Sequence, residues 1–401
     1  MRINNIIILG MYPYPWHYQE ISDTMRLMTN AFVNVKKIFL NPSVGFRRAK
    51  AEKYPFQMTW GLKECGDVLV CTPPLETIPS SFGLGELKDI LIMKALNKLI
   101  SSILGAQWRE ETILYLSSGG ITQSYKTMRT LLPKWTILDV LDDNIGFPGI
   151  EGQKKVMLNR QFGYILINAT LVTAVSKFLV DCLQENYSVK VEWLPNGLDV
   201  EKYTHKQIYD QPIEELRQLE RPLFGFVGAL TSWLDFDLLW KIAEYLKKGT
   251  LVLVGPLIEN AVPQDLLVRL RNHHRIVFLG AKPYNQVPHF LHQFDVLLLP
   301  RNYQPHSLAS DPLKFYEYLA TGKPVVSTAL PSVKRFSDTI FIGERHEDFL
   351  VALERAQKEW SNEHSIRMKK VVMGMSWKKR AEKMMDLFYD NVKNKVHPGT
   401  E

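Results

Sequence analysis

Lys314 and Glu317 stand three residues apart in the short segment 310–326, and their side chains suit phosphate and ribose binding. Residues three apart share a helix face. A lysine in the first turn of a helix favours a phosphate there, because the N-terminal N–H groups carry partial positive charge. A carboxylate on the same face can accept hydrogen bonds from a ribose diol. The pair predicts a nucleoside diphosphate site, although a capped surface helix with an incidental ion pair would give the same pattern.

The residues around this pair predict a complete short helix. Asp311 is expected to cap it, and Pro312 suits its first position. Gly322, followed by Lys-Pro, is expected to end it. The helix follows an apolar run that ends at Leu299, so we expect its N-terminus to face a cleft at the carboxyl end of a sheet.

Two neighbouring carboxylates, Asp142 and Asp143, end the apolar run 136–142. A general base is needed to remove the proton from a hydroxyl as it attacks a carbon atom, and adjacent negative charges raise the pKa of one carboxylate toward that task. We predict Asp142 as the base, with Asp143 as the second candidate. The alternative is that Asp-Asp-Asn is turn chemistry preceding the next helix.

An aromatic loop follows the first apolar run of the chain. It contains Trp16, His17 and Tyr18, and aromatic faces stack well on sugars. We expect these three residues to bind the acceptor, the molecule whose hydroxyl attacks, with His17 as an alternative base. A plain hydrophobic loop with one polar histidine is the competing interpretation.

Short apolar runs alternate with stretches of helical length, which is typical of parallel sheets with crossover helices. The fold class predicted is α/β. The strands expected in the first half lie near 4–9, 34–40, 67–71, 112–117, 136–142, 170–175 and 189–194, with a long helix over 86–104. In the second half they lie near 223–228, 250–254, 276–279, 295–299, 324–327 and 339–342.

The two series of strands predict two doubly wound domains that face each other across a cleft. The pattern breaks at Leu194-Pro195-Asn196-Gly197, and the polar stretch that follows carries no strand signal. We therefore expect an N-terminal domain over 1–197 and a C-terminal domain over 198–376, with a helix over 377–392 that crosses back to the first domain.

The segment 310–326 resembles the donor-site motif of GT-B glycosyltransferases related to family 4, also called glycosyl transferases group 1. The resemblance extends to Ala174-Val175-Ser176 with Leu194-Pro195-Asn196-Gly197-Leu198-Asp199, to Gly255-Pro256 and to Leu279-Gly280 with Pro283-Tyr284. It implies two Rossmann-like domains, of which the C-terminal one binds the nucleotide-sugar donor and the N-terminal one the acceptor. Teichuronic acid and exopolysaccharide glycosyltransferases are the relatives that it suggests.

By this resemblance, Lys314 meets the diphosphate and Glu317 the ribose of the donor. The other donor-binding residues that it implies are Gly228, Trp233, Asp235, Gly255, Pro312 and Leu313. Asp235-Phe236-Asp237 has the form of a metal-binding Asp-x-Asp motif, but residues two apart do not share a helix face, and Ser232 with Asp235 is typical of a capping arrangement. No metal and no cofactor are expected beyond the nucleotide sugar as co-substrate.

Ala309 departs from the family pattern. Many family 4 enzymes have a Glu at this position, eight residues before the ribose Glu, and it contacts the transferred sugar. The retaining mechanism usual in that family is therefore not carried over. Related inverting GT-B enzymes use an aspartate of the first domain as the base, which favours Asp142.

Composition bounds these interpretations. The chain has 401 residues, 46% hydrophobic and 23% charged, which favours a folded protein of two domains over a disordered or fibrous one. The three cysteines, an odd number, favour neither a disulfide framework nor a zinc site, so a reducing cytoplasm fits best. The net charge of +7 is spread evenly between the two halves, which argues against a nucleic-acid partner.

The function expected from the resemblance is transfer of a sugar from a nucleoside-diphosphate sugar, expected to be a UDP-sugar, to a cell-envelope or exopolysaccharide glycan or a lipid-linked acceptor. Cationic and aromatic residues at 46–56 suit peripheral contact with an anionic membrane on its inner face. Two alternatives are a GT-B-fold nucleotide-sugar epimerase, which needs no acceptor, and a non-catalytic nucleotide-sugar-binding partner subunit. A Rossmann oxidoreductase fits least, because neither Gly10 nor Gly228 opens a Gly-x-Gly-x-x-Gly loop.

Overall fold

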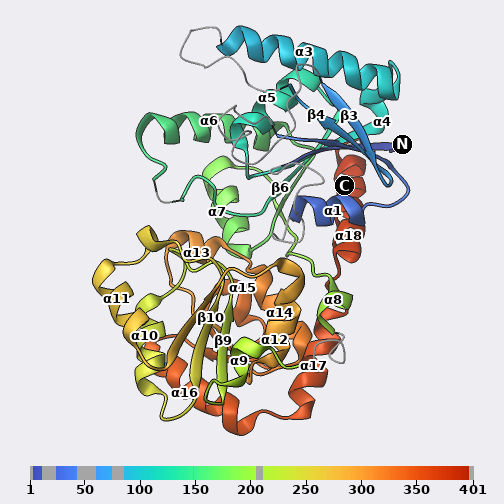
Figure 1. Cartoon of the computed structure of the whole chain (residues 1–401). Helices are drawn as coiled ribbons and strands as arrows, with labels where there is room; N and C mark the ends of the chain where they lie inside the picture. The colour runs from blue at the N-terminus through green and yellow to red at the C-terminus, as the bar shows by residue number, and fades with distance from the viewer. Residues whose placement is uncertain are drawn as a thin grey trace.

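A computed structural model describes residues 3–10, 24–42, 60–74, 85–147, 149–204 and 211–396. These residues form two domains, each built on one largely parallel sheet, and the two domains lie one above the other in Figure 1. The predicted α/β class with two parallel-sheet domains is confirmed.

The first sheet has the strand order β3-β4-β2-β1-β5-β6-β7-β8, with helices between most of its strands. The elements of this domain are β1 (Asn5–Leu9), α1 (Thr24–Ala31), β2 (Lys36–Leu40), β3 (Gly61–Cys65), β4 (Val68–Thr72), α3 (Gly85–Leu104), α4 (Trp108–Glu111), β5 (Thr112–Ser117), α5 (Ile121–Leu131), β6 (Trp135–Val140), α6 (Gly152–Asn168), β7 (Leu171–Ala174), α7 (Lys177–Tyr187) and β8 (Glu192–Trp193).

The central strands of this sheet are buried on both faces. Every residue of β1 and β5 is buried, as expected where helices cover both sides of a parallel sheet. Their apolar runs are therefore continuous rather than alternating, and such runs could be recognised in the sequence.

Strand β3 was not predicted. It pairs antiparallel with β4 at the edge of the sheet, and the turn between them contains Gly66, which has a positive φ of 63°. The exposed side chains of Leu62, Lys63 and Glu64 give β3 no apolar run, so periodicity could not reveal it. The Gly-Asp pair between two short segments was the available hairpin signal.

The second sheet has six parallel strands in the order β11-β10-β9-β12-β13-β14. Two short helices, α8 (Val200–Thr204) and α9 (Glu214–Arg217), precede it. Its elements are β9 (Leu223–Val227), α10 (Phe236–Tyr245), β10 (Thr250–Val254), η3 (Glu259–Ala261), α11 (Gln264–Asn272), β11 (Ile276–Gly280), η4 (Tyr284–Gln286), α12 (Val287–Gln293), β12 (Val296–Leu299), α13 (Pro305–Ala309), α14 (Leu313–Thr321), β13 (Val325–Thr328), α15 (Pro331–Lys334), β14 (Phe341–Gly343), α16 (His346–Glu359) and α17 (Asn362–Val372).

The direction of chain progression reverses once in each sheet. In the first sheet β1 lies between β2 and β5, and in the second β9 lies between β10 and β12. The loops that leave such a pair of strands diverge and open a crevice at the carboxyl ends, where ligands bind in folds of this class. The second sheet therefore places the loops after β9 and β12 at one crevice.

The C-terminal helix α18 (Trp377–Val396) returns to the first domain. Its residues Trp377, Met384 and Phe388 are buried in one cluster with apolar residues of β1 and β5. In Figure 1 this helix, in red, lies beside α1 of the upper domain. Both ends of the described chain are thus attached to the same sheet.

Candidate functional site

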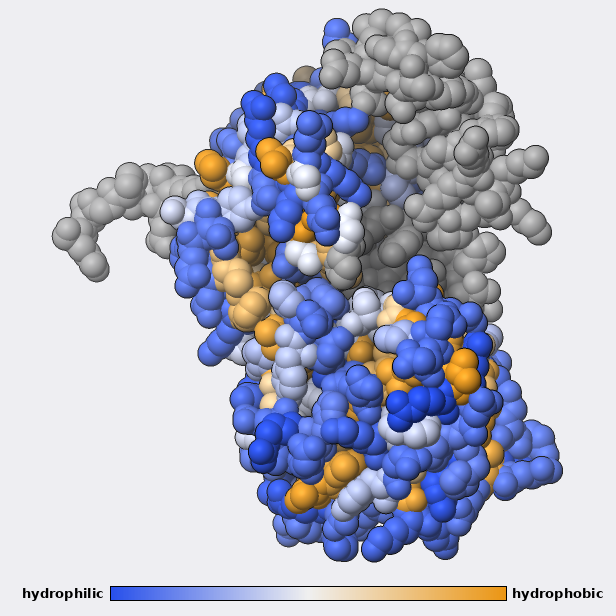
Figure 2. Space-filling view, turned by 90° about the vertical axis from the view of Figure 1, so that its left-hand side faces the viewer, coloured by the Kyte–Doolittle hydropathy of each residue, from blue (hydrophilic) through white to orange (hydrophobic). Residues whose placement is uncertain are grey.

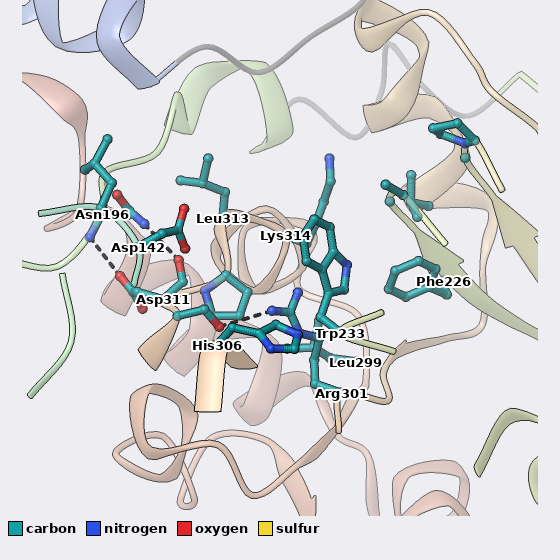
Figure 3. Close-up of a pocket in the computed structure, with 18 of the residues that line it drawn as sticks. Asp142, Asn196, Phe226, Trp233, Leu299, Arg301, His306, Asp311, Leu313 and Lys314 are labelled. Atoms are coloured by element: carbon teal, nitrogen blue, oxygen red, sulfur yellow. Dashed lines mark hydrogen bonds between the residues drawn. The ribbon is translucent and has the colours of Figure 1, made fainter. Parts of the chain in front are cut away.

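A cavity of about 630 Å³ lies between the two domains. Its lining includes Ser118 and Asp142, which follow β5 and β6 of the first sheet, and Gly228, Arg301 and Lys314 of the second domain. Figure 3 shows labelled side chains from both domains converging on it. The volume lies within the range of small-molecule sites, about 300 to 1,000 Å³.

Helix α14 presents its N-terminal end to this cavity. Pro312, Leu313 and Lys314 all line the cavity. As predicted, the helix ends at Gly322, which has a positive φ of 68° that favours glycine. The carboxyl end of β12, at Leu299, lines the same cavity.

The prediction that Asp311 caps this helix is wrong. Pro312, not Asp311, occupies the capping position, and Asp311 bonds elsewhere. The Asp311 carboxylate accepts hydrogen bonds from the backbone N–H of Asn196, at 2.8 Å, and from the Tyr316 hydroxyl, at 2.7 Å. The Asn196 side chain also donates to the Asp311 carbonyl at 2.8 Å. Asp311 therefore joins the start of α14 to the segment that links the domains.

Lys314 and Glu317 form the predicted pair on one face of α14. The ammonium of Lys314 lies 3.0 Å from Glu317 Oε2, and the Tyr284 hydroxyl lies 3.4 Å from Glu317 Oε1. Lys314 lines the cavity, whereas Glu317 is only 2% exposed and is not among the lining residues. The structure therefore places Glu317 behind Lys314, where it orients the ammonium; in this conformation it does not face the cavity as a ribose ligand would.

Gly228 and Gly255 line the cavity where β9 and β10 end. A Cβ atom on Gly255, whose φ is 143°, would lie 1.9 Å from the backbone oxygen of Gly228. Only glycine allows the two loops to approach so closely. Gly228, with a φ of 159°, has a Cβ position 3.8 Å from the Lys314 side chain, so both glycines lie beside the predicted phosphate-binding end of α14.

Asp142 is half-buried at the carboxyl end of β6 and lines the cavity from the first domain. Burial is the main cause that raises its pKa to about 6. The Arg301 guanidinium opposes this rise in pKa, and the charges of Asp143 and Asp311 add to it. A carboxyl group with this pKa is ionised at neutral pH yet basic enough to accept a proton.

Asp143 and Asn144 fit the turn interpretation instead. The Asp143 carboxylate accepts the backbone N–H of Gly146 at 2.8 Å, and a Cβ at Gly146 would collide with it. The amide of Asn144 donates to Ser118 Oγ at 2.7 Å and to the Asp142 carbonyl at 3.0 Å. Asp143 is not among the residues that line the cavity, so the structure brings Asp142 alone of the two to the site.

Trp233 lines the cavity, but Asp235 does not. Asp235 caps α10, because its Oδ1 accepts the backbone N–H of Leu238 at 2.8 Å. Its Oδ2 lies 2.8 Å from His346 Nε2. Its position in the family-like pattern thus corresponds to a structural role. Within the described ranges, no group of three or more His, Cys, Asp or Glu side chains is arranged to hold a metal ion.

Two of the sequence predictions fall on segments outside the described residues. One is the acceptor site at Trp16, His17 and Tyr18, and the other is the cationic and aromatic segment 46–56. Both stay predictions.

Sequence reasoning missed Arg301 and His306, which both line the cavity. Arg301 directly follows the Leu299-Pro300 end of β12, and His306 belongs to α13. Burial lowers the pKa of Arg301 to about 10, and burial together with the Arg301 charge lowers the pKa of His306. Their position between a strand end and the helix α14 was the signal that could have found them.

Ala309, at the position where the resembled family has a sugar-binding Glu, does not line the cavity. Its side chain is fully buried against the core of the first domain, and its carbonyl accepts a 2.6 Å hydrogen bond from Ser176 Oγ. This position is therefore part of the contact between the domains.

Comparison with known proteins identifies a glycosyl transferases group 1 domain over residues 221–362. A protein of Bacillus subtilis named as a putative teichuronic acid biosynthesis glycosyltransferase is 30% identical over 214 residues, which cover 51% of this chain and 52% of that protein. The UDP-Gal:alpha-D-GlcNAc-diphosphoundecaprenol alpha-1,3-galactosyltransferase of Escherichia coli is 27% identical over 232 residues, 53% of this chain and 58% of that enzyme. The chain thus spans about half the length of these curated relatives.

Solved structures match the chain over nearly its whole length. A trehalose-6-phosphate protein of E. coli bound with UDP-2-fluoro glucose aligns with a TM-score of 0.69 at 12% identity, covering 96% of this chain and 99% of that one. Sucrose-phosphate synthase of Thermosynechococcus elongatus aligns with a TM-score of 0.68 at 14% identity, covering 97% and 100%. At these identities the likeness establishes the fold, which is GT-B.

Proposed function

We propose that this chain is a glycosyltransferase that binds a nucleoside-diphosphate sugar in the cavity between its domains. One observation carries the proposal: the N-terminal end of α14 with Lys314, and the carboxylate of Asp142, face one cavity from opposite domains. A transferase needs positive charge for a leaving diphosphate and a base for the attacking hydroxyl. The group 1 domain and the names of the relatives support the same activity.

The chemistry proposed is a direct displacement. An acceptor hydroxyl attacks the anomeric carbon of the sugar, Asp142 takes the proton of that hydroxyl, and the bond from the anomeric carbon to the diphosphate oxygen breaks. Lys314 and the N–H groups at the start of α14 stabilise the charge that develops on the departing diphosphate. A displacement of this kind inverts the anomeric centre and is proposed to need no metal ion.

The donor site is tested by calorimetric titration with UDP, GDP, dTDP and their sugars. We expect one nucleotide to bind the wild type and to bind Lys314→Ala at least tenfold more weakly. Lys358→Ala is the matched control, because Lys358 is an exposed lysine of the same domain that pairs with Glu354 on the surface of α16. If no nucleotide binds the wild type, the proposed function is wrong.

Turnover distinguishes a transferase from the alternatives. Donor consumption that requires an added acceptor supports transfer, donor isomerisation without acceptor identifies an epimerase, and binding without any turnover identifies a non-catalytic subunit. Nuclear magnetic resonance of the product gives its anomeric configuration. Inversion is expected; retention would contradict the role given to Asp142.

We further propose that the donor is a UDP-sugar and that the acceptor is a lipid-linked glycan met at a membrane surface. Two relatives support this: one is named for a diphosphoundecaprenol acceptor and UDP-Gal, the other for teichuronic acid biosynthesis. Among the described residues, no helix is long and apolar enough to cross a membrane. Contact with lipid would therefore be through a surface of the described part of the chain or through segments outside it.

Helix α6 offers such a surface. Its exposed side chains include Val156, which is 70% exposed, Ile167, which is 68% exposed, and the cations Lys154, Lys155 and Arg160. Neither α6 nor the adjacent α5 contains an acidic residue. Figure 2 shows hydrophobic patches set among hydrophilic residues on this side of the molecule. Apolar side chains flanked by cations suit an anionic interface.

Sedimentation with vesicles tests this surface. We expect the wild type to bind vesicles of phosphatidylglycerol and phosphatidylcholine more strongly than vesicles of phosphatidylcholine alone. The double variant Val156→Glu/Ile167→Glu should lose most of this binding. Val268→Glu is the control, because Val268 is 55% exposed on α11 of the other domain. Equal binding by the double variant and the control would contradict the role of α6.

A further inference from the structure

Two buried nitrogen atoms of residues that line the cavity have no hydrogen-bond partner among the described residues: Nε of Arg301 and Nε2 of His306. Leaving a buried polar group unpaired costs free energy, and for part of a charged group the cost is larger. In native proteins most such groups are paired with protein, water or ligand. The two side chains lie close together in Figure 3, which points to a ligand that pairs with both.

The Arg301 guanidinium is held in place through Nη2, but its buried Nε–H has no partner among the described residues. It donates one N–H to Ser310 Oγ at 3.1 Å, and it lies 5.2 Å from the centre of the Trp233 ring. Its Nε–H is free to donate. The guanidinium remains positively charged at neutral pH, because its lowered pKa is still about 10. Such a group matches the oxygens of a carboxylate.

His306 supplies an acceptor. It is 6% exposed, and the Ser232 backbone lies close enough to the ring to act on its pKa. A neutral ring with its proton on Nδ1 leaves the lone pair of Nε2, which has no partner among the described residues, unused. The lowered pKa of His306 keeps the ring neutral, so Nε2 accepts a hydrogen bond from a hydroxyl.

This part of the cavity lies next to Asp142, the proposed base, and not only next to the proposed diphosphate site. Arg301 and Asp142 are close enough for each to shift the pKa of the other. Ser310, which Arg301 contacts, also lines this cavity. The other carboxylate in the lining, Asp311, already accepts hydrogen bonds from Asn196 and Tyr316.

We infer that the transferred sugar carries a carboxylate, as a hexuronic acid does, that Arg301 binds this carboxylate, and that His306 accepts a hydrogen bond from a neighbouring sugar hydroxyl. The inference rests on the proposed function and adds the class of sugar.

The experiment is calorimetric titration of the full chain with UDP, UDP-glucose, UDP-glucuronic acid, UDP-galactose and UDP-galacturonic acid, together with GDP, GDP-mannose and GDP-mannuronic acid. For one nucleotide, the wild type should bind an acidic sugar at least tenfold more tightly than its neutral counterpart. Arg301→Gln should abolish this preference and leave the affinity for the free nucleoside diphosphate unchanged. His306→Phe should weaken binding of acidic and neutral sugars by the same factor, so that the preference remains. Melting curves confirm that both variants fold.

Two results would overturn the inference while leaving the proposed function intact. One is equal affinity of the wild type for acidic and neutral sugars. The other is an Arg301→Gln variant whose affinity for the free nucleoside diphosphate falls as much as its affinity for the sugars, which would make Arg301 a phosphate ligand. Absence of any nucleotide binding by the wild type would instead overturn the proposed function and this inference with it.

Discussion

Arg380 on helix α18 forms a bidentate ion pair with Asp139 on strand β6, although the two residues are 241 positions apart in the chain. Its Nη1 lies 2.8 Å from Asp139 Oδ2 and its Nη2 lies 2.9 Å from Oδ1. The two side chains are 2% and 0% exposed. Tyr115 and Thr173 donate to the same carboxylate at 2.7 Å, so its charge is fully satisfied. Arg380 also donates from Nε to the Pro195 carbonyl at 2.8 Å, next to the link between the domains.

Replacing one member of this pair should destabilise the protein strongly. Arg380→Met leaves the Asp139 carboxylate buried without its counter-charge, and such losses cost about 3–5 kcal/mol. Chemical denaturation measures the change in the free energy of unfolding. Arg380→Lys keeps the charge but loses the second bond, so a smaller loss is expected. The control Arg355→Met removes an exposed ion pair with Glu359 and should cost less than about 1 kcal/mol. Equal losses for Arg380→Met and Arg355→Met would contradict this account.

Glu317 should act through Lys314 rather than on the ribose. Because its carboxylate bonds Lys314 and is 2% exposed, Glu317→Ala should weaken nucleoside diphosphate binding several-fold, and Glu317→Gln less. Titration with UDP and 2′-deoxy-UDP separates the two roles. If Glu317 only positions the lysine, the ratio of the two affinities is the same in the wild type and in Glu317→Ala. If the ratio falls toward one in Glu317→Ala, Glu317 contacts the ribose, as the family resemblance implies.

Gly255→Ala should disrupt the loops that form one wall of the cavity. The added methyl group would lie 1.9 Å from the Gly228 oxygen, so one of the two loops must move. We expect nucleotide affinity to fall at least tenfold in calorimetric titration, with a lower melting temperature. Gly374→Ala is the control, because the nearest atom to its added methyl group, the Val371 oxygen, lies 3.4 Å away. Unchanged nucleotide affinity in Gly255→Ala would show that the loops tolerate the movement.

The parts of this site that could be predicted from the sequence are those in which a local pattern determines the geometry. The helix around Lys314 has its ending glycine and its apolar periodicity within a dozen residues, and the strand before Asp142 is largely apolar. Asp311 was misassigned because its partner Asn196 lies 115 residues away, and a capping residue and a buried acceptor have the same residue type. Arg301 and His306 belong to no motif, and only their position between the end of β12 and the start of α14 pointed to the cavity.

Asp142 should lower the stability of the folded protein at neutral pH. Its pKa is raised from 3.8 to about 6 in the folded state, so the folded state binds the proton more tightly and stability falls as pH rises between these two values. Asp142→Asn removes this cost. The variant should therefore be more stable than the wild type above pH 6, by at most about 3 kcal/mol, and nearly as stable as the wild type at about pH 4. Unfolding free energies at about pH 4 and about pH 7.5 measure this. A variant that is less stable at both would contradict the raised pKa.

The same group should set the acid limb of the transfer reaction. A base must be deprotonated to accept the proton, so kcat/KM should rise about tenfold per pH unit below about 6 and level off above it. The Arg301 charge lowers the pKa of Asp142, so Arg301→Gln should move this limb to higher pH in addition to changing the plateau. Asp143→Asn should move the limb slightly to lower pH, because the neighbouring negative charge is removed. Initial rates at acceptor concentrations well below KM, from about pH 4.5 to about pH 8.5, give kcat/KM for the acceptor and so measure all three profiles. A limb that stays in place in Arg301→Gln would mean that a group other than Asp142 takes the proton.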